Sequence, residues 1–252
     1  MIAPVAAKTL AWETVLIDGS ERLRFGRRLF RWLPHDPRCR MCRAPFAGSG
    51  GRVLGLFGRR PSRKSPNLCE PCFEALPDGG IELDVGILFA DVRGSTTLGE
   101  QATATEFAST LNRFYASATK VLVEHDAIID KLIGDEVMAI FLPGLAGGAY
   151  RRRAAEAAIA LARAAHDLPI GVAANAGTAF VGKVGTGPVI DFTALGDAVN
   201  VASRLQSYAQ DGQVVLAADL YELVRADHPS GSATRIEVKG REEPIDVVVV
   251  SA

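Results

Sequence analysis

The chain has 252 residues, of which 48% are hydrophobic, 23% charged and 7% aromatic, and its formal net charge is −1. This composition is sufficient for a folded core and excludes a wholly disordered chain, while the lack of an apolar run of about 18 residues argues against a transmembrane helix. The N-terminus does not resemble a secretory signal, and four cysteines are too few for a disulfide scaffold at this length, so we expect a globular protein of the cytoplasm.

Charge is distributed unevenly along the chain. Between Ser20 and Lys64 there are thirteen Arg and Lys residues and two acids, so this segment carries +11 and the remainder carries −12. Such a split predicts two modules. A basic module can bind nucleic acid or an anionic membrane, dock on the acidic part of its own chain, or remain a solvated arm. Nucleic-acid or membrane contact is not favoured, because few aromatic residues for base stacking lie there.

We expect residues 1–38 to form a basic leader. Within residues 21–33 the apolar residues recur at roughly helical spacing between arginines, and His-Asp-Pro at residues 35–37 ends this helix. Residues 39–76 hold the four cysteines and a middle rich in Gly, Pro, Arg and Ser, which is typical of loops. We expect residues 77–80 to form a linker, which leaves residues 81–252 as a second domain.

The second domain alternates between strand and helix patterns. A strand over residues 81–92 is followed by a helix over 103–124, two short strands around Gly134-Asp135, an alanine-rich helix over 151–168 and a strand over 169–177. A glycine-rich loop over 180–189 then leads into a strand and helix over 191–209, and a strand, a short helix and two strands close the chain. This order predicts an α+β, ferredoxin-like βαββαβ domain with additional C-terminal elements. Its sheet should be mostly antiparallel, with helices on one face.

Two aspartates occupy positions that favour a shared site. Asp91 ends the first strand, and Asp135 lies in the tight turn of the predicted hairpin. If the hairpin pairs beside the first strand, the two carboxylates lie about 5 Å apart and repel each other unless a cation joins them. Such oxygen ligands suit Mg²⁺ or Mn²⁺. Turn chemistry and helix capping are the alternative explanations of the two residues.

Three sequence blocks carry a family resemblance. FADVRGST at residues 89–96, DKLIGDEVMAIF at 130–141 and DFTALGDAVNVASRL at 191–205 resemble, in this order and spacing, the catalytic domain of class III nucleotide cyclases. The likeness covers roughly residues 81–250. It implies that Asp91 and Asp135 bind two Mg²⁺ or Mn²⁺ ions, together with the backbone carbonyl of Val92. Phe89 either flanks this pocket or belongs to the core.

The resemblance also implies how a nucleotide is held. Lys131 and Thr193 occupy the adenine-recognition positions, where guanylate cyclases typically have Glu and Cys, so ATP is the favoured substrate; Thr at this position is found in a bacterial subset of the family. A Lys ammonium can donate to the ring, and a Thr hydroxyl can accept from the exocyclic amine. Asn200 is expected to orient the ribose, and Arg204 to stabilise the charge that develops on the phosphate. Lys239 matches the lysine that holds the terminal phosphates.

The implied activity is that of an adenylate cyclase. The ribose 3′-oxygen of ATP attacks the α-phosphorus with the help of two metal ions, which gives 3′,5′-cyclic AMP and pyrophosphate. The family's sites lie between two subunits, one supplying the metal aspartates and the other the remaining residues. Because this chain has the whole set, we expect a head-to-tail homodimer. The alternatives are an inactive cyclase-like nucleotide sensor and a basic, cysteine-containing protein that binds nucleic acid. The four histidines lie outside the three blocks, and none is predicted to be catalytic.

The cysteines form two CxxC pairs, Cys39/Cys42 and Cys69/Cys72, separated by 26 residues. Two such pairs predict a metal site, and four thiolates favour a closed, structural zinc site in a treble-clef-like module. An iron–sulfur cluster is the second interpretation. A disulfide is the third, because it does not suit the cytoplasm. As a hypothesis, this module folds the basic leader against the cyclase domain and tunes the geometry of the dimer.

Overall fold

The computed structural model describes residues 12–30, 32–33, 37–164, 168–187, 189–238, 241 and 243–251. The chain divides into two compact units. The first, which we call the Cys unit, comprises the residues up to Leu83 together with Pro143–Gly147 and Phe180–Ala194. The second, the sheet unit, comprises Asp84–Leu142, Gly148–Ala179 and the residues from Leu195 onward. Two segments of the predicted catalytic domain therefore belong to the Cys unit.

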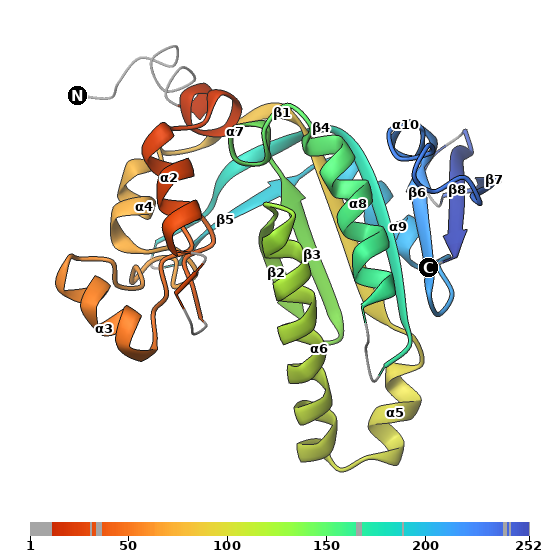
Figure 1. The fold of residues 1–252 in the computed structure, drawn as a ribbon, viewed down its shortest axis with the longest axis horizontal. Coiled ribbons are helices and arrows are strands. Elements are labelled where there is room, and N and C mark those ends of the chain that lie inside the picture. Colours follow the sequence, from red (N-terminus) through yellow and green to blue (C-terminus); the bar gives the residue numbers. More distant parts are fainter. Residues whose placement is uncertain are drawn as a thin grey trace. The chain divides into compact units, whose positions relative to one another are not determined.

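Short helices lead up to the first strand (Figure 1). They are the π-helix η1 (Thr14–Asp18) and the α-helices α2 (Glu21–Phe30), α3 (Gly48–Leu56) and α4 (Glu70–Ala75). The helix predicted over residues 21–33 forms as α2 and ends three residues earlier. Its buried face includes Arg27, whose Nη1 donates to the backbone oxygens of Arg40 at 3.2 Å and Met41 at 2.8 Å. This buried arginine thus fixes α2 against the loop that carries the first cysteine pair.

Helix α3 corrects the loop predicted for the glycine-rich middle of residues 39–76. Its backbone comes so close to Phe46 that a Cβ on Gly51 would lie 2.5 Å from the Phe46 carbonyl carbon. Only glycine permits this approach. The glycines that suggested a loop are therefore required, at least at Gly51, by packing around the helix.

The remaining elements follow in the predicted order, with additional short helices. They are β1 (Gly80–Val92), α5 (Ser95–Gln101), α6 (Ala104–Glu124), β2 (Ile128–Ile133), β3 (Glu136–Phe141), α7 (Pro143–Ala146), α8 (Tyr150–Arg163), β4 (Ile170–Thr186), β5 (Val189–Leu195), α9 (Asp197–Gln206), β6 (Gln213–Ala217), α10 (Ala218–Glu222), β7 (Ser232–Ile236) and β8 (Ile245–Ser251). Helix α6 begins with a capping box, in which Thr103 and Glu106 exchange hydrogen bonds. This arrangement stabilises the start of the helix.

The strand order is β2-β3-β1-β4-β6-β8-β7, with β5 paired to β4. Strands β1 and β3, β2 and β3, β6 and β8, and β7 and β8 pair antiparallel, whereas β4 and β6 are parallel. The order β2-β3-β1-β4, with α6 and α8 as connections, is that of a ferredoxin-like βαββαβ unit. The predicted fold class is therefore confirmed, with β6, α10, β7 and β8 as the C-terminal additions.

The main core lies between the sheet and helices α6 and α8, which cover the same face (Figure 1). Alternate strand residues point into it, such as Val172 and Ala174 of β4. Ala173, between them, belongs to a second cluster that includes Val201 and Leu205 of α9. Because side chains alternate between the faces of a strand, α9 packs on the opposite face. The expectation of helices on one face holds for α6 and α8 and is wrong for α9.

The glycine-rich loop predicted over residues 180–189 is also corrected. Strand β4 continues to Thr186, and β5 begins at Val189, so the segment forms a β-hairpin. Gly182 lies against the start of β1, where an added Cβ would be 2.4 Å from Gly79 O and from Gly80 Cα. A glycine inside a strand commonly marks such a close backbone approach, and here it was mistaken for loop chemistry.

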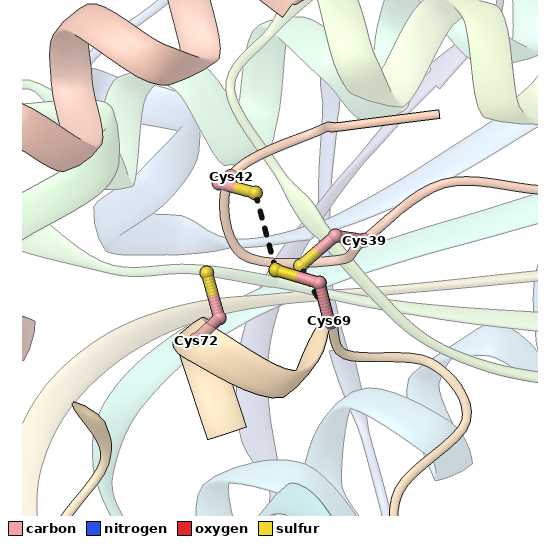
Figure 2. A group of neighbouring side chains, drawn as sticks. All are labelled: Cys39, Cys42, Cys69 and Cys72. Atoms are coloured by element: carbon pink, nitrogen blue, oxygen red, sulfur yellow. Dashed lines mark hydrogen bonds between the residues drawn. The ribbon is translucent and has the colours of Figure 1, made fainter. Parts of the chain in front are cut away.

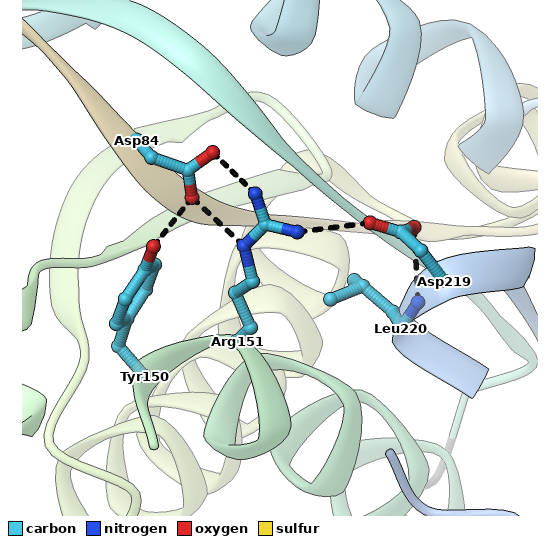
Figure 3. A network of polar contacts seen from close by, with 5 residues as sticks. All are labelled: Asp84, Tyr150, Arg151, Asp219 and Leu220. Atoms are coloured by element: carbon cyan, nitrogen blue, oxygen red, sulfur yellow. Dashed lines mark hydrogen bonds and ion pairs between the residues drawn. The ribbon is translucent and has the colours of Figure 1, made fainter. Parts of the chain in front are cut away.

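A polar network links β1 to α8 and α10 in the sheet unit (Figure 3). Asp84 accepts hydrogen bonds from Arg151 Nε at 2.9 Å, from Arg151 Nη2 and from the Tyr150 hydroxyl at 2.5 Å. Arg151 also donates to Asp219 at 3.1 Å. Burial acts to raise the pKa of Asp84, but the hydrogen bonds from Arg151 and Tyr150 outweigh it and lower this pKa. The network therefore favours the charged carboxylate.

Candidate active site and cysteine cluster

The two aspartates predicted to share a site lie close together at one end of the sheet unit. β1 and β3 pair antiparallel with Asp91 opposite Glu136, so the hairpin lies beside the first strand as predicted. Ile133 pairs with Glu136, which leaves Gly134 and Asp135 as the two-residue turn. Gly134 has a φ of +61°, a conformation that this kind of turn requires and glycine adopts easily. The backbone N–H of Val92 donates to the carbonyl of Asp135 at 3.3 Å.

The electrostatics of this pair favour a cation. Burial, the charge of Asp135 and a hydrogen bond to the Asp135 side chain raise the pKa of Asp91 to about 6. Burial and the charges of Asp91 and Asp135 also raise the pKa of Glu136. Three carboxyl groups therefore crowd together, and Arg93 is the neighbouring cation, with its Nη1 3.8 Å from Asp91 Oδ2. Hard oxygen donors in this arrangement fit Mg²⁺ or Mn²⁺.

Successive side chains of β1 point to opposite faces of the sheet, and this explains which residues lie beside Asp91. Val92 is buried and faces the helix-covered core together with Ala90. Phe89 precedes Asp91 by two residues, shares its face of the strand, and is buried. The side chain of Val92 thus belongs to the core, while its backbone directly follows Asp91 at the end of β1.

Lys131 lies on β2 at an irregularity in the pairing with β3, where the register shifts between Ile129 and Lys131. Such bulges change the direction of a side chain. Lys131 is half-buried, and its Nζ is 3.9 Å from Oδ2 of Asp130. Asp130 is fully buried and was not identified from the sequence as a site residue. No local signal in the sequence identifies it, because its burial depends on how β2 pairs with β3.

Asn200 and Arg204 share one face of α9, as their spacing predicts. Asn200 is exposed and Arg204 is half-buried, whereas Val201 and Leu205 face the core. Arg241 donates to Asp197 at 2.5 Å, which places Arg241 near the start of α9. Lys239 lies outside the described residues.

Thr193 lies on β5 in the Cys unit and is buried. Its hydroxyl is 3.5 Å from the carbonyl oxygen of Ala194, to which it donates. Among the residues predicted to contact the nucleotide, Thr193 belongs to a different unit from Lys131 and Asn200. The two aspartates also belong to that other unit.

Two side chains beside the aspartates were missed by sequence reasoning, in addition to Glu136. Arg93 follows Asp91 by two residues, and its Nη2 also donates to the carbonyl of Gln206. Tyr115 of α6 donates to the carbonyl of Gly134 and so holds the turn. Burial and the charge of Asp135 raise the pKa of Tyr115. Neither contact has a local signal, because each joins segments far apart in the chain.

The four cysteines form a second cluster, within the Cys unit. Their sulfur atoms all lie within 4.8 Å of one another, and the side chains point toward a common centre (Figure 2). Cys42 Sγ and Cys69 Sγ are 3.7 Å apart. The predicted grouping of the two CxxC pairs is therefore present, as a set of donors that can hold a metal ion.

Groups around the cluster favour negative charge on sulfur. Arg59 Nη1 donates to Cys42 Sγ at 3.2 Å, and the backbone N–H of Cys69 donates to Cys39 Sγ at 3.3 Å. Burial acts to raise the pKa of Cys39, but hydrogen bonds from the other three thiols bring it well below its usual value, and hydrogen bonds within the cluster raise the pKa of Cys42 and Cys72. Burial acts to lower the pKa of Arg59, but the charges of the cysteines outweigh burial and raise this pKa. Such donors to the sulfurs are what a thiolate metal site requires.

Comparison with known proteins agrees with this fold and these motifs. The family model for the adenylate and guanylate cyclase catalytic domain matches residues 82–251. An adenylate cyclase from Anabaena cylindrica is 31% identical over 207 residues, which cover 70% of this chain and 40% of that protein. The chain spans less than half of the length of these curated relatives, between 29% and 40%.

Solved cyclase structures share the fold. The adenylyl cyclase CyaB from P. aeruginosa superimposes with a TM-score of 0.60 and 26% identity, over 68% of this chain and 95% of that one. The guanylyl cyclase Cya2 gives a TM-score of 0.64 and 23% identity, over 68% and 93%. Within the described part of the chain, no helix has both the length and the apolar character needed to cross a membrane. The family match covers well over half of the sequence, and the chain therefore belongs to the class III adenylate and guanylate cyclase catalytic domain family.

Proposed function

We propose that this chain is an adenylate cyclase, which converts ATP to 3′,5′-cyclic AMP and pyrophosphate. The observation that carries the proposal is the adjacency of the Asp91 and Asp135 carboxyl groups at the end of β1, inside a matched cyclase domain. Such a pair of oxygen ligands suits a reaction on a nucleoside triphosphate, whose phosphates need divalent cations.

Asp91, Asp135 and the carbonyl of Val92 are the groups that would hold two Mg²⁺ or Mn²⁺ ions. The raised pKa of Asp91 and the crowding by Glu136 support this assignment, because a cation would relieve the repulsion among the carboxylates. When bound, the ions would activate the ribose 3′-hydroxyl and neutralise charge on the triphosphate.

The residues of the chain then bind and orient the nucleotide. Lys131 and Thr193 are proposed to contact the adenine ring as donor and acceptor, Asn200 to orient the ribose, and Arg204 to stabilise the charge of the transferring phosphate. Lys239 is proposed to hold the terminal phosphates. In the reaction the 3′-oxygen forms a bond to the α-phosphorus, and the bond from that phosphorus to the pyrophosphate oxygen breaks. Positioning and charge stabilisation provide most of the rate enhancement in chemistry of this kind.

The direct test is product formation from ATP and from GTP with Mg²⁺ or Mn²⁺. We expect cyclic AMP from ATP, with a kcat/KM at least about tenfold above that for GTP, because a mismatched hydrogen-bonding edge leaves polar groups unpaired. Lys131→Glu combined with Thr193→Cys should shift the preference toward GTP. Cyclic GMP as the main product of the unaltered chain would contradict the adenylate assignment, and the absence of both products would contradict cyclase activity.

A homodimer with composite sites is part of the proposal. The exposed position of Asn200 on α9 suits a residue that reaches a partner subunit. Mixing Asp91→Ala with Asn200→Ala chains should give about a quarter of the normal activity, since half of the dimers are mixed and each contains one intact site of two. The matched control mixes Asp91→Ala with Asp135→Ala, which leaves no intact site in any dimer. Equal activity in both mixtures would contradict shared sites.

The proposal assigns one structural Zn²⁺ to the four cysteines. A tetrahedral ion with Zn–S bonds of about 2.3 Å places sulfurs about 3.8 Å apart, and the Cys42–Cys69 separation is 3.7 Å. A cluster of several irons would hold the sulfurs farther apart, and a disulfide requires about 2.0 Å. The reducing cytoplasm that we propose as the location keeps such thiols available. Metal analysis should give about one zinc per chain, whereas iron with a visible absorption band would contradict zinc.

A further inference from the structure

The end of β4 from Phe180 onward and β5 up to Ala194 belong to the Cys unit, which also holds the cysteine cluster. Arg40 stands between Cys39 and Cys42, and its side chain is only 15% exposed. Its Nη1 is 3.4 Å from Oδ1 of Asp191 on β5. The residue between the first two metal ligands therefore contacts the second strand of the hairpin directly.

The backbone at Arg40 lies within the first cysteine pair and is hydrogen-bonded to the segment before the second pair. Its N–H donates to the carbonyl of Asn67 at 2.9 Å, two residues before Cys69. A metal ion bound by Cys39 and Cys42 on one side and Cys69 on the other would fix this arrangement, because its bonds close both loops at once. The position of the Arg40 side chain is thus coupled to the integrity of the cluster.

Two further contacts hold the hairpin. The N–H of Ile190 on β5 donates to the carbonyl of Lys64 at 3.0 Å, in the loop before Cys69. On β4, Lys183 donates to the carbonyl of Leu76 at 2.6 Å and lies over the ring of Phe73 at 4.3 Å, at the end of the helix that carries Cys72. Both strands are therefore attached to segments that the cysteines join.

The contact at Asp191 lies close to a residue proposed to bind the base. Asp191 and Thr193 are two positions apart on β5, so their side chains share one face of the strand. β5 then continues through Gly196 into α9, which carries Asn200. A displacement of β5 would thus move Thr193.

We propose that the cysteine cluster, when it holds its metal ion, positions β5 for nucleotide binding, with Arg40 as the positioning residue that transmits this through Asp191. The inference rests on the proposed function in one respect, which is the role of Thr193 at the base. It assigns the Cys unit a part in substrate selection that a purely structural module would not have.

The test uses charge reversal in the full chain. Arg40→Asp and Asp191→Arg should each raise the KM for ATP by roughly threefold to tenfold, since contacting charged pairs couple at this level, with a smaller effect on kcat. The double variant, with the charges exchanged, should return KM to within about twofold of normal. Arg63→Asp makes the same charge change at an exposed position of the same unit and should leave KM unchanged.

Two measurements separate this inference from the proposals on which it depends. Hydrogen exchange of the amides over residues 189–195, and above all of Ile190, should quicken in Arg40→Asp and recover in the double variant, whether or not the chain turns over ATP. Metal content should stay at the normal value in all four variants, because none removes a cysteine. Unchanged exchange and unchanged KM in Arg40→Asp would overturn the positioning role. An inactive unaltered chain would instead count against the cyclase assignment, and the exchange data would still decide the role of Arg40.

Discussion

Replacing Asp91 by Asn should stabilise the protein while abolishing its proposed activity. The pKa of Asp91 is raised from 3.8 to about 6 by burial and by Asp135, a shift that corresponds to roughly 3 kcal/mol if none of it is screened. The side chain is 24% exposed, so solvent reduces this, and we expect a gain of about 1 kcal/mol at pH 7.5 in buffer without magnesium or manganese.

The sign of the effect follows from proton linkage. A carboxyl whose folded pKa is raised binds more protons in the folded state, so the wild-type protein loses stability as the pH rises from about 4 to about 6. Above pH 6 the penalty is complete, and below pH 4 it is absent. The advantage of Asp91→Asn should therefore appear over this interval and remain constant above it. Urea denaturation at fixed protein concentration, without a chelator, measures it.

Asp84→Asn on the same strand is the matched control, with the opposite sign. Hydrogen bonds from Arg151 and Tyr150 lower the pKa of Asp84 against the effect of burial. Its carboxylate therefore stabilises the folded protein above the unfolded pKa of about 4, and this contribution disappears as the pH falls through the lowered folded value. Asp84→Asn should destabilise at pH 7.5. If Asp91→Asn also destabilises there, the repulsion inferred between Asp91 and Asp135 is wrong. Manganese should stabilise the wild type and not Asp91→Asn.

Three further substitutions test the packing of the fold, each measured by urea denaturation. Phe141→Ala removes a fully buried ring from the core beneath α6 and α8 and should cost about 3–5 kcal/mol; a cost below 1 kcal/mol would contradict that core. Gly182→Ala places a Cβ 2.4 Å from Gly79 O and should cost about 1–3 kcal/mol, whereas Gly148→Ala, with open space around it, should be nearly neutral. Thr103→Ala loses the capping box of α6 and should cost about 1 kcal/mol; an equal loss in Thr105→Ala, inside the helix, would point to a cause other than the cap.

The parts of the site that the sequence predicted correctly are those fixed by local chain geometry. Gly134-Asp135 forms a two-residue turn, and this turn sets the pairing of β2 with β3. Once β3 lies beside β1, the end of β1 brings Asp91 to the turn. The i, i+4 spacing of Asn200 and Arg204 likewise fixes their common face on α9. Only the pairing of β3 with β1 joins distant segments, and the βαββαβ order of the elements predicts it.

The errors arise where a glycine allows one part of the chain to pack closely against another part. Gly182 and Gly51 were taken as signs of loops, but Gly182 meets Gly80 and Gly51 meets Phe46, and each lies within a regular element. A glycine required for close approach is indistinguishable by composition from one required for a turn. Asp130 was missed for a related reason, since its burial depends on how β2 pairs.

The basic segment shows a further limit of what amino-acid composition can predict about binding partners. A charge of +11 over residues 20–64 left several interpretations open, from a solvated arm to contact with an acidic partner. In the structure Arg27 donates to backbone carbonyls near the first cysteine pair, Arg38 donates to the carbonyls of Phe30 and Leu33, and Arg59 donates to Cys42 Sγ. The guanidinium groups of these arginines make contacts within the Cys unit, so fewer of them are available to a partner than the composition suggests.

The residues proposed to act on one nucleotide are divided between the two units, and this division has a functional consequence. Asp91, Asp135 and Asn200 belong to the sheet unit, where the antiparallel pairing of β1 with β3 and the core under α6 and α8 hold the aspartates independently of the cysteines. Thr193 belongs to the Cys unit, on a strand attached through Asp191 to the loop between two cysteines. The proposed contact of Thr193 with the base and the proposed binding of the ions therefore depend on different sets of contacts. We expect a change at the cysteine cluster to act first on the contact of Thr193, because the bonds that hold the aspartates lie in the other unit.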